Sequence, residues 1–161
     1  MAFKKKPTLV MFCGLPGSGK TTLGRHLEAE TGAIRICTDE WMDDLGFDHF
    51  DEPLRNKVEQ RIWNFGKNLL RLGYDVILEN GLWSRQERED LLRQANEIGA
   101  LTEMHYFNVP FEELCCRLEI RNKLGGFGIV PITREQMESY VPLFQPPTEE
   151  ELALYDCSVT H

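Results

Sequence analysis

A glycine-rich segment near the N-terminus constrains the fold of this chain more than any other feature. It has the full pattern Gly-x-x-x-x-Gly-Lys-[Ser/Thr] and follows a short apolar run. This pattern predicts a phosphate-binding P-loop when a strand precedes it and a helix follows it, and both are expected here. The loop consists of Gly14, Leu15, Pro16, Gly17, Ser18, Gly19, Lys20 and Thr21.

The residue types of the loop explain its chemistry. Its three glycines allow the backbone to curl, so that successive N–H groups can point at a chain of phosphates. We expect Lys20 to reach the β- and γ-phosphates of ATP, Thr21 to bind Mg²⁺ through its hydroxyl, and Thr22 to join the nucleotide contacts. A glycine turn without chemical role is the alternative, which the strand–loop–helix context disfavours.

Composition and charge narrow the class of protein. With 161 residues, one P-loop domain spanning 1–161 is expected. The net charge of −8 disfavours nucleic acid as a partner, since such binding needs a basic surface. No apolar stretch is long enough to cross a membrane. The five cysteines lack a Cys-x-x-Cys spacing, which favours reduced thiols and a cytoplasmic location.

Short apolar runs alternate with amphipathic segments, which predicts a three-layer α/β fold with a parallel sheet. Strands are expected at 8–13, 33–37, 75–79, within 101–109 and within 152–160. Helices are expected from the loop to Gly32 and over 54–72, 84–98, 110–122 and 133–144, whereas 39–44 shows no clear period. The buried stripe of the longest helix is expected to contain Leu54, Val58, Ile62, Phe65, Leu69 and Leu72.

Two carboxylates follow predicted strands, at the edge where α/β sheets bind ligands. Asp39 could orient an acceptor hydroxyl and take its proton; alternatively, Thr38 or Asp39 is a helix N-cap. Glu79 could hold Mg²⁺ together with Thr21. Its alternative is a strand-end carboxylate satisfied by loop amides, and the sequence leaves the two readings open.

Two arginines precede a glycine-rich segment that we expect to be a mobile lid, 123–132. Arg117 and Arg121 share one helix face because they are four residues apart. They could contact the nucleotide and neutralise the transferred phosphoryl group. The alternative is a solvated pair that bridges to Glu113.

Aromatic residues surround the segments expected near an acceptor, and an aromatic pocket would suit a small organic molecule. Trp63 lies on a helical stripe, which favours core packing instead. His26 and His49 show no partner pattern and are expected at the surface. The aromatic set is Trp41, Phe47, Phe50, Trp63 and Trp83.

Several stretches resemble a family of small kinases with an AAA-domain label, similar to chloramphenicol phosphotransferases, zeta toxins and shikimate- or gluconate-kinase-like proteins. The resemblance implies a five-stranded parallel sheet in the order 2-3-1-4-5. It also implies Asp39 as acceptor base, Arg117 and Arg121 as lid arginines, and Arg85 as an acceptor or phosphate contact. Glu79 departs from the family, which often has Asp there. The resembling stretches are 14–23, 38–40, 81–88, Arg117 with 121–122, 132–135 and 143–148.

These observations favour an ATP-dependent kinase that moves the γ-phosphate to a hydroxyl of a small molecule, with Trp83 and Arg85 among its acceptor contacts. A P-loop regulatory or toxin-like protein and a nucleic-acid 5′-kinase are the alternatives. The sequence leaves monomer and homodimer open.

Overall fold

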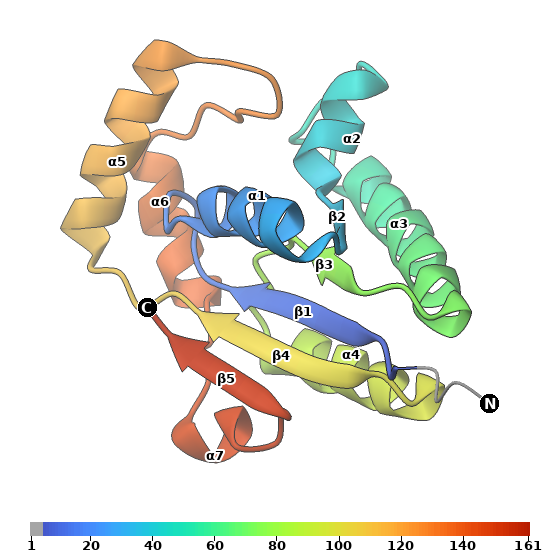
Figure 1. The fold of residues 1–161 in the computed structure, drawn as a ribbon. Helices are drawn as coiled ribbons and strands as arrows, with labels where there is room; N and C mark the ends of the chain where they lie inside the picture. Colours follow the sequence, from blue (N-terminus) through green and yellow to red (C-terminus); the bar gives the residue numbers. More distant parts are fainter. Residues whose placement is uncertain (1–4) are drawn as a thin grey trace.

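The computed structural model describes residues 5–161, so the first four residues of the predicted 1–161 domain lie outside it. Its centre is a five-stranded parallel sheet in the order β2-β3-β1-β4-β5 (Figure 1). This is the predicted order, so the expected P-loop fold class is confirmed. The strands are β1 (Thr8–Cys13), β2 (Ile34–Ile36), β3 (Val76–Leu78), β4 (Leu101–Tyr106) and β5 (Cys157–Thr160).

The helices begin and end close to the predicted residues. Three helices end at glycines with a left-handed backbone conformation, Gly32, Gly73 and Gly99. Two helices begin with capping boxes, at Ser84 and Thr133. The segment after β2, in which the sequence shows no clear period, is helical. Helix α5 runs to Leu124, so the first two residues of the predicted lid belong to this helix. The helices are α1 (Lys20–Thr31), α2 (Thr38–Asp44), α3 (Glu52–Leu72), α4 (Arg85–Ile98), α5 (Phe111–Leu124), α6 (Arg134–Tyr140), the 3₁₀ turn η1 (Val141–Leu143) and α7 (Glu149–Leu152).

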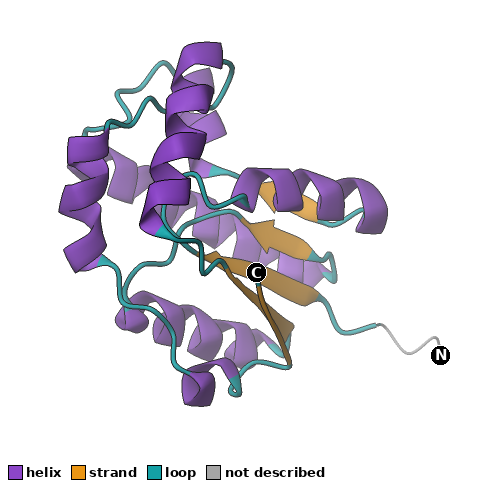
Figure 2. Cartoon of the chain, turned by 90° about the vertical axis from the view of Figure 1, so that its left-hand side faces the viewer, coloured by secondary structure: helices purple, strands orange, loops and turns teal. Residues whose placement is uncertain are grey.

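Helices cover both faces of the sheet, which gives three layers (Figure 2). Successive side chains of β1 point to opposite faces, as the pleat requires. Leu9 and Met11 pack on the side of α3 and α4, whereas Val10 and Phe12 pack on the side of α1. The central strand is therefore buried on both faces, as its continuous apolar run predicted.

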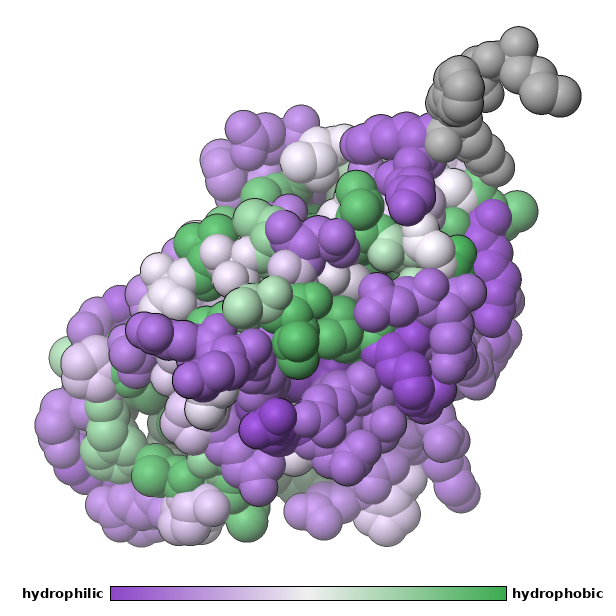
Figure 3. Space-filling model, turned by 90° about the horizontal axis from the view of Figure 1, so that it is seen from below, coloured by the Kyte–Doolittle hydropathy of each residue, from purple (hydrophilic) through white to green (hydrophobic). Residues whose placement is uncertain are grey.

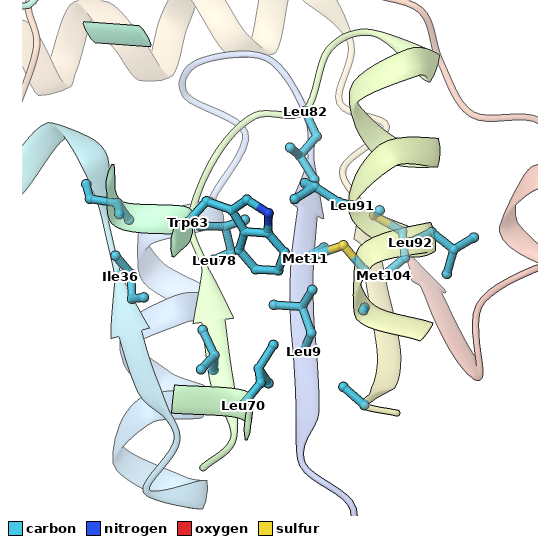
Figure 4. Packing of buried hydrophobic residues seen from close by; sticks show 14 of the residues in the cluster. Leu9, Met11, Ile36, Trp63, Leu70, Leu78, Leu82, Leu91, Leu92 and Met104 are labelled. Carbon is cyan, nitrogen blue, oxygen red and sulfur yellow. The ribbon is translucent and has the colours of Figure 1, made fainter. Parts of the chain in front are cut away.

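The largest cluster of buried residues lies between the sheet and helices α3 and α4 (Figure 4). Trp63 is buried there, which confirms the core reading, and its Nε1 donates to Gln94 Oε1 at 3.0 Å. The predicted stripe of α3 was wrong at Phe65 and Leu72, which are 39% and 62% exposed. Trp63 and Gly66 occupy that face instead, because glycine lets the helix approach β2 closely.

A buried ion pair ties α4 to the C-terminal part of the chain. Arg88 is fully buried and donates to both carboxylate oxygens of Glu151, at 2.5 and 3.0 Å. The same guanidinium donates to the carbonyls of Leu82 and Trp83, in the turn before α4. Leu82 has a φ of 43°, which is costly for a side chain of this size. Arg88 therefore holds a strained turn in place.

Arg88→Ala should lower the free energy of unfolding by about 3–5 kcal/mol, because it leaves the Glu151 carboxylate buried without its partner. Denaturant unfolding measures this difference. Arg93→Ala is the matched control, since Arg93 lies on the same helix and is paired with Glu97 in an exposed position. Equal stability of the two variants would contradict the role given to Arg88.

No helix among residues 5–161 combines the length and apolar character needed to cross a bilayer. Seen from below, hydrophilic residues dominate the surface, with hydrophobic ones gathered in a smaller area between them (Figure 3).

Candidate active site

The phosphate loop joins β1 to α1 with the geometry that its glycines allow. Gly17 and Gly19 have φ angles of 79° and 107°, a region that favours glycine. Gly14 does not need a positive φ; a side chain there would instead meet Ser18 Oγ at 2.8 Å. Gly19 is the N-cap of α1 and makes no side-chain cap bond. The first amides of α1 are thus available to an anion.

Lys20 lies inside the curl of this loop. Its Nζ donates to the carbonyls of Gly14 and Leu15 at 3.0 and 2.8 Å. Burial lowers the pKa of Lys20 to about 8, although the charges of Glu79 and Asp39 oppose the shift. A partly desolvated ammonium group of this kind binds phosphate oxygens strongly, since little water has to be displaced.

Thr21 and Glu79 meet at one point beside the loop. The Thr21 hydroxyl donates to Glu79 Oε1, while Arg35 binds the other carboxylate oxygen. Gly24 makes room for this contact, because a Cβ there would lie 2.9 Å from Glu79 Oε2. A hydroxyl and a carboxylate oxygen are ligands that Mg²⁺ accepts, with phosphates and water completing its shell. The two residues therefore fit a nucleotide-bound Mg²⁺, and the longer Glu side chain does reach Thr21.

Asp39 lies at the first turn of α2, yet it is not a helix cap. The N-cap of α2 is Cys37 without a side-chain cap bond, and Thr38 instead donates to Asn80 Oδ1 at 2.9 Å. Asp39 Oδ1 accepts from Arg55 of α3 at 2.8 Å. The capping alternative is therefore excluded for both Thr38 and Asp39. The carboxylate is 35% exposed and lines the pocket described below.

His49 is not a surface residue, which corrects the prediction; His26 is exposed as expected. The His49 side chain is 14% exposed, with Nε2 at 2.7 Å from Asp43 Oδ1 and Nδ1 at 3.8 Å from Asp39 Oδ1. The other oxygen of Asp43 accepts from the backbone N–H of Gly128. The predicted lid segment therefore touches α2 at Asp43, and Figure 1 shows this loop directed from α5 toward α2.

The two lid arginines have different surroundings. Arg117 pairs with Glu113 on the same helix, as expected if it belongs to a solvated charge pair. It also donates weakly to Ser18 O of the P-loop. Arg121 donates to Val130 O at 3.0 Å, and its buried Nε has no partner among the described residues. Burial lowers the pKa of Arg121, while Asp39 opposes that shift. Its guanidinium lines the pocket described below.

If the pocket transfers phosphoryl groups, Arg121→Ala should reduce turnover by roughly 10²-fold, because it removes a guanidinium that lines the pocket together with the P-loop. Arg117→Ala should act mainly on the affinity for nucleotide, since Arg117 contacts the P-loop backbone. Steady-state kinetics with varied ATP separate these effects. Unchanged kinetics in both variants would restore the reading as a solvated charge pair.

One pocket of about 750 Å³ contains most of the predicted site residues. Its walls include residues 16–22, Asp39, Glu79, both lid arginines, Phe50 and Trp83. Gly14 and Leu15 of the P-loop are not among the lining residues, and Leu15 packs in a buried apolar cluster. Arg85 is not among the lining residues; it is exposed and binds Glu89. Trp41 also lies elsewhere, against Phe65. Lining residues that the sequence did not single out include His49, Arg55, Glu59, Asn80 and Tyr140.

The comparison with protein families agrees with this geometry. The family model described as an AAA domain matches residues 9–147. The chain belongs to this AAA-domain family. Among curated proteins, the signal recognition particle 54 kDa protein of Methanosphaera stadtmanae is 31% identical over 120 residues, which are 64% of this chain and 27% of that protein. The chain spans about a quarter of the length of these curated relatives.

Solved structures of other proteins share the fold of this chain. A putative kinase from Chloroflexus aurantiacus has a TM-score of 0.75 at 17% identity, covering 97% of this chain and 88% of that one. A chain of the Pnkp1/Rnl/Hen1 RNA repair complex has a TM-score of 0.72 at 25% identity, covering 85% and 43%. The Mycobacterium tuberculosis APS kinase CysC, in complex with AMPPNP and APS, has a TM-score of 0.66 at 21% identity, covering 96% and 88%. The AAA-domain protein thus has the fold of P-loop kinases.

Proposed function

We propose that this protein is an ATP-dependent phosphotransferase that moves the γ-phosphate to a hydroxyl group of a small molecule. The observation that carries the proposal is the position of Asp39. Its carboxylate lines the same pocket as the P-loop and Arg121, and it caps no helix. A protein that only switches between nucleotide states needs no such carboxylate beside the phosphates, whereas a kinase uses one to orient the acceptor.

The residues divide the reaction between them. The P-loop amides and Lys20 bind the phosphates, and Thr21 with Glu79 would hold Mg²⁺, which supplies charge neutralisation on the phosphate oxygens. Asp39 orients the acceptor hydroxyl and takes its proton, while Arg121 binds the oxygens of the transferred group. The acceptor oxygen forms a bond to the γ-phosphorus as the bond to the β–γ bridging oxygen breaks. The products are ADP and a phosphate monoester.

The lid supports this assignment because transfer has to exclude water. Val130 and Ile132 are buried against α5 and α6, and Asn122 exchanges hydrogen bonds with Ile132 at the base of the loop. The tip meets α2 at Asp43. The lid is therefore anchored at its base, and we propose that its tip, around Gly128, opens for ATP and closes over it.

Five free thiols, of which Cys116 and Cys157 are exposed, support a reducing cytoplasmic location as part of the same proposal.

The proposed activity is tested with ATP labelled on the γ-phosphate and a panel of hydroxyl compounds. Slow hydrolysis alone, with label entering a new phosphate ester when one class of acceptor is added, is the expected result. A panel that never yields a labelled ester, together with ATP binding of ordinary affinity, would contradict the kinase assignment and favour a nucleotide-binding regulator.

A further inference from the structure

The pocket has a second end, away from the phosphate loop, which we call the acceptor end. It is built by α2, α3, α6, the 45–51 connection and the segment that opens α4. Asp39 connects it to the phosphate end. Its lining residues are Asp39, His49, Phe50, Glu52, Arg55, Glu59, Trp83, Glu87 and Tyr140.

Negative charge dominates this acceptor end. Within the described chain, its lining includes four carboxylates and a single guanidinium, that of Arg55. Arg55 donates to Asp39 at 2.8 Å and to Glu59 at 3.1 Å, so its charge is already shared between two acids. Among the described residues of the acceptor end, an anionic acceptor would find no guanidinium that is not already paired with a carboxylate. It would also meet several like charges in a partly desolvated space, which is costly.

The carboxylates are close enough to influence one another. Burial raises the pKa of Glu59, and the charges of Glu87 and Asp39 raise it further, although Arg55 opposes them. Glu59 is thus a partly buried carboxylate that one arginine does not fully compensate. A bound cation would lower this electrostatic cost, as an opposite charge favours the ionised form.

Aromatic rings complete the same end. Trp83 and Tyr140 have ring centroids 4.9 Å apart with the planes tilted by 49°. Tyr140 lines the same pocket as Arg55 and Glu52. Aromatic faces next to carboxylates bind organic cations, because the ring quadrupole and the carboxylates attract the same charge.

The phosphate end has the opposite character. Lys20, Arg117 and Arg121 line it, and the Glu79 carboxylate there is neutralised by Arg35. ATP and the acceptor would therefore meet walls of opposite sign in one pocket. This separation lets a cationic acceptor bind beside the polyphosphate with favourable charge on both sides.

We propose that the phosphate acceptor is a hydroxyl compound that carries an ammonium group, such as an amino sugar or an amino alcohol. The hydroxyl lies at Asp39, and the ammonium group lies among Glu52, Glu59 and Glu87 beside Trp83 and Tyr140. This inference rests on the proposed kinase activity. It excludes acceptors in which the hydroxyl is surrounded by negative charge, including sugar acids and the 5′ end of a nucleic acid.

Matched acceptors test the inference. Ammonium-bearing polyols and amino alcohols, their neutral hydroxyl counterparts, the corresponding sugar acids and a 5′-hydroxyl oligoribonucleotide are each incubated with labelled ATP. We expect kcat/KM for an ammonium compound to exceed that for its neutral counterpart by about tenfold or more. Transfer that is best to a neutral or anionic compound would overturn this inference while supporting the kinase. Transfer to none of them, with ATP bound normally, would count against the proposed function itself and this inference with it.

A variant locates the ammonium group. Glu59→Gln keeps the size of the side chain and should raise KM for the ammonium acceptor by about tenfold, with kcat and the affinity for ATP nearly unchanged. The preference over the neutral counterpart should shrink by the same factor. Glu97→Gln, on the exposed face of α4, is the control. A Glu59→Gln protein with wild-type unfolding temperature and unchanged acceptor preference would overturn the placement.

Discussion

Lys20→Ala is expected to abolish phosphoryl transfer, with a loss of at least about 10²-fold in turnover. Lys20 is the cation that the P-loop itself encloses, and its ammonium group is held by the loop carbonyls of Gly14 and Leu15. From that position it can follow the β- and γ-phosphates as their charge changes during transfer. Neither lid arginine makes these contacts, because both extend from α5 and donate instead to the carbonyls of Ser18 and Val130.

Turnover with a responsive acceptor measures this effect, and ATP titration measures the accompanying loss of affinity. Lys57→Ala is the control, since Lys57 is an exposed lysine on α3 that does not line the pocket. If the Lys20 variant kept more than about a tenth of wild-type turnover, the role given to the phosphate loop would be wrong.

Asp39→Asn is expected to lower turnover by about 10²- to 10⁴-fold while the affinity for ATP changes little. The substitution keeps the size of the side chain and can still accept a hydrogen bond from Arg55. It removes the negative charge that orients the acceptor hydroxyl and takes its proton. The fold should survive, because Arg55 retains Glu59 as a partner and no helix cap is lost.

Three measurements interpret the Asp39 variant: turnover, ATP affinity and unfolding temperature. Asp44→Asn is the matched control, as Asp44 is exposed on the same helix. Normal turnover in Asp39→Asn would leave Asp39 as a structural partner of Arg55 only, and would move the interpretation toward a nucleotide-binding module. A loss of turnover accompanied by a large loss of stability would also contradict the base assignment, because that assignment requires turnover to fall while the unfolding temperature stays unchanged.

Glu79 replaces the Asp that is common in the resembling family, and the surrounding packing accommodates the longer side chain. Glu is one methylene longer than the Asp common in the resembling family. The structure accommodates this length because Gly24 of α1 leaves room for the carboxylate and Arg35 holds its far oxygen. The Mg²⁺ role of Thr21 and Glu79 stays a prediction, and its geometry is now specific: both oxygens face one point beside the P-loop.

Much of the fold follows from short-range features of the sequence. The continuous apolar run of β1, the P-loop pattern and the glycines that end α1, α3 and α4 act over a few residues, and these predictions agree with the structure. The error in the buried stripe of α3 arose because periodicity alone was used there. Phe65 and Leu72 continue the apolar stripe of α3, yet the helix turns Trp63 and Gly66 toward the sheet because their shapes suit that contact.

Contacts between residues far apart in the chain, including those that form the acceptor end, could not be predicted from such local patterns. Asp39 and Arg55 are 16 residues apart, Asp43 and Gly128 are 85 apart, and Arg88 and Glu151 are 63 apart. No local pattern relates such residues, because each pairing depends on how whole helices pack on the sheet. The sequence by itself determined the phosphate loop and most helix ends, since these depend on backbone conformation and local hydrophobic spacing. The strand order was implied only by the family resemblance, because no local pattern says which strands lie side by side. Only the tertiary structure decided that four carboxylates and one arginine share the acceptor end, because the charge of a pocket depends on which side chains the packed helices bring together.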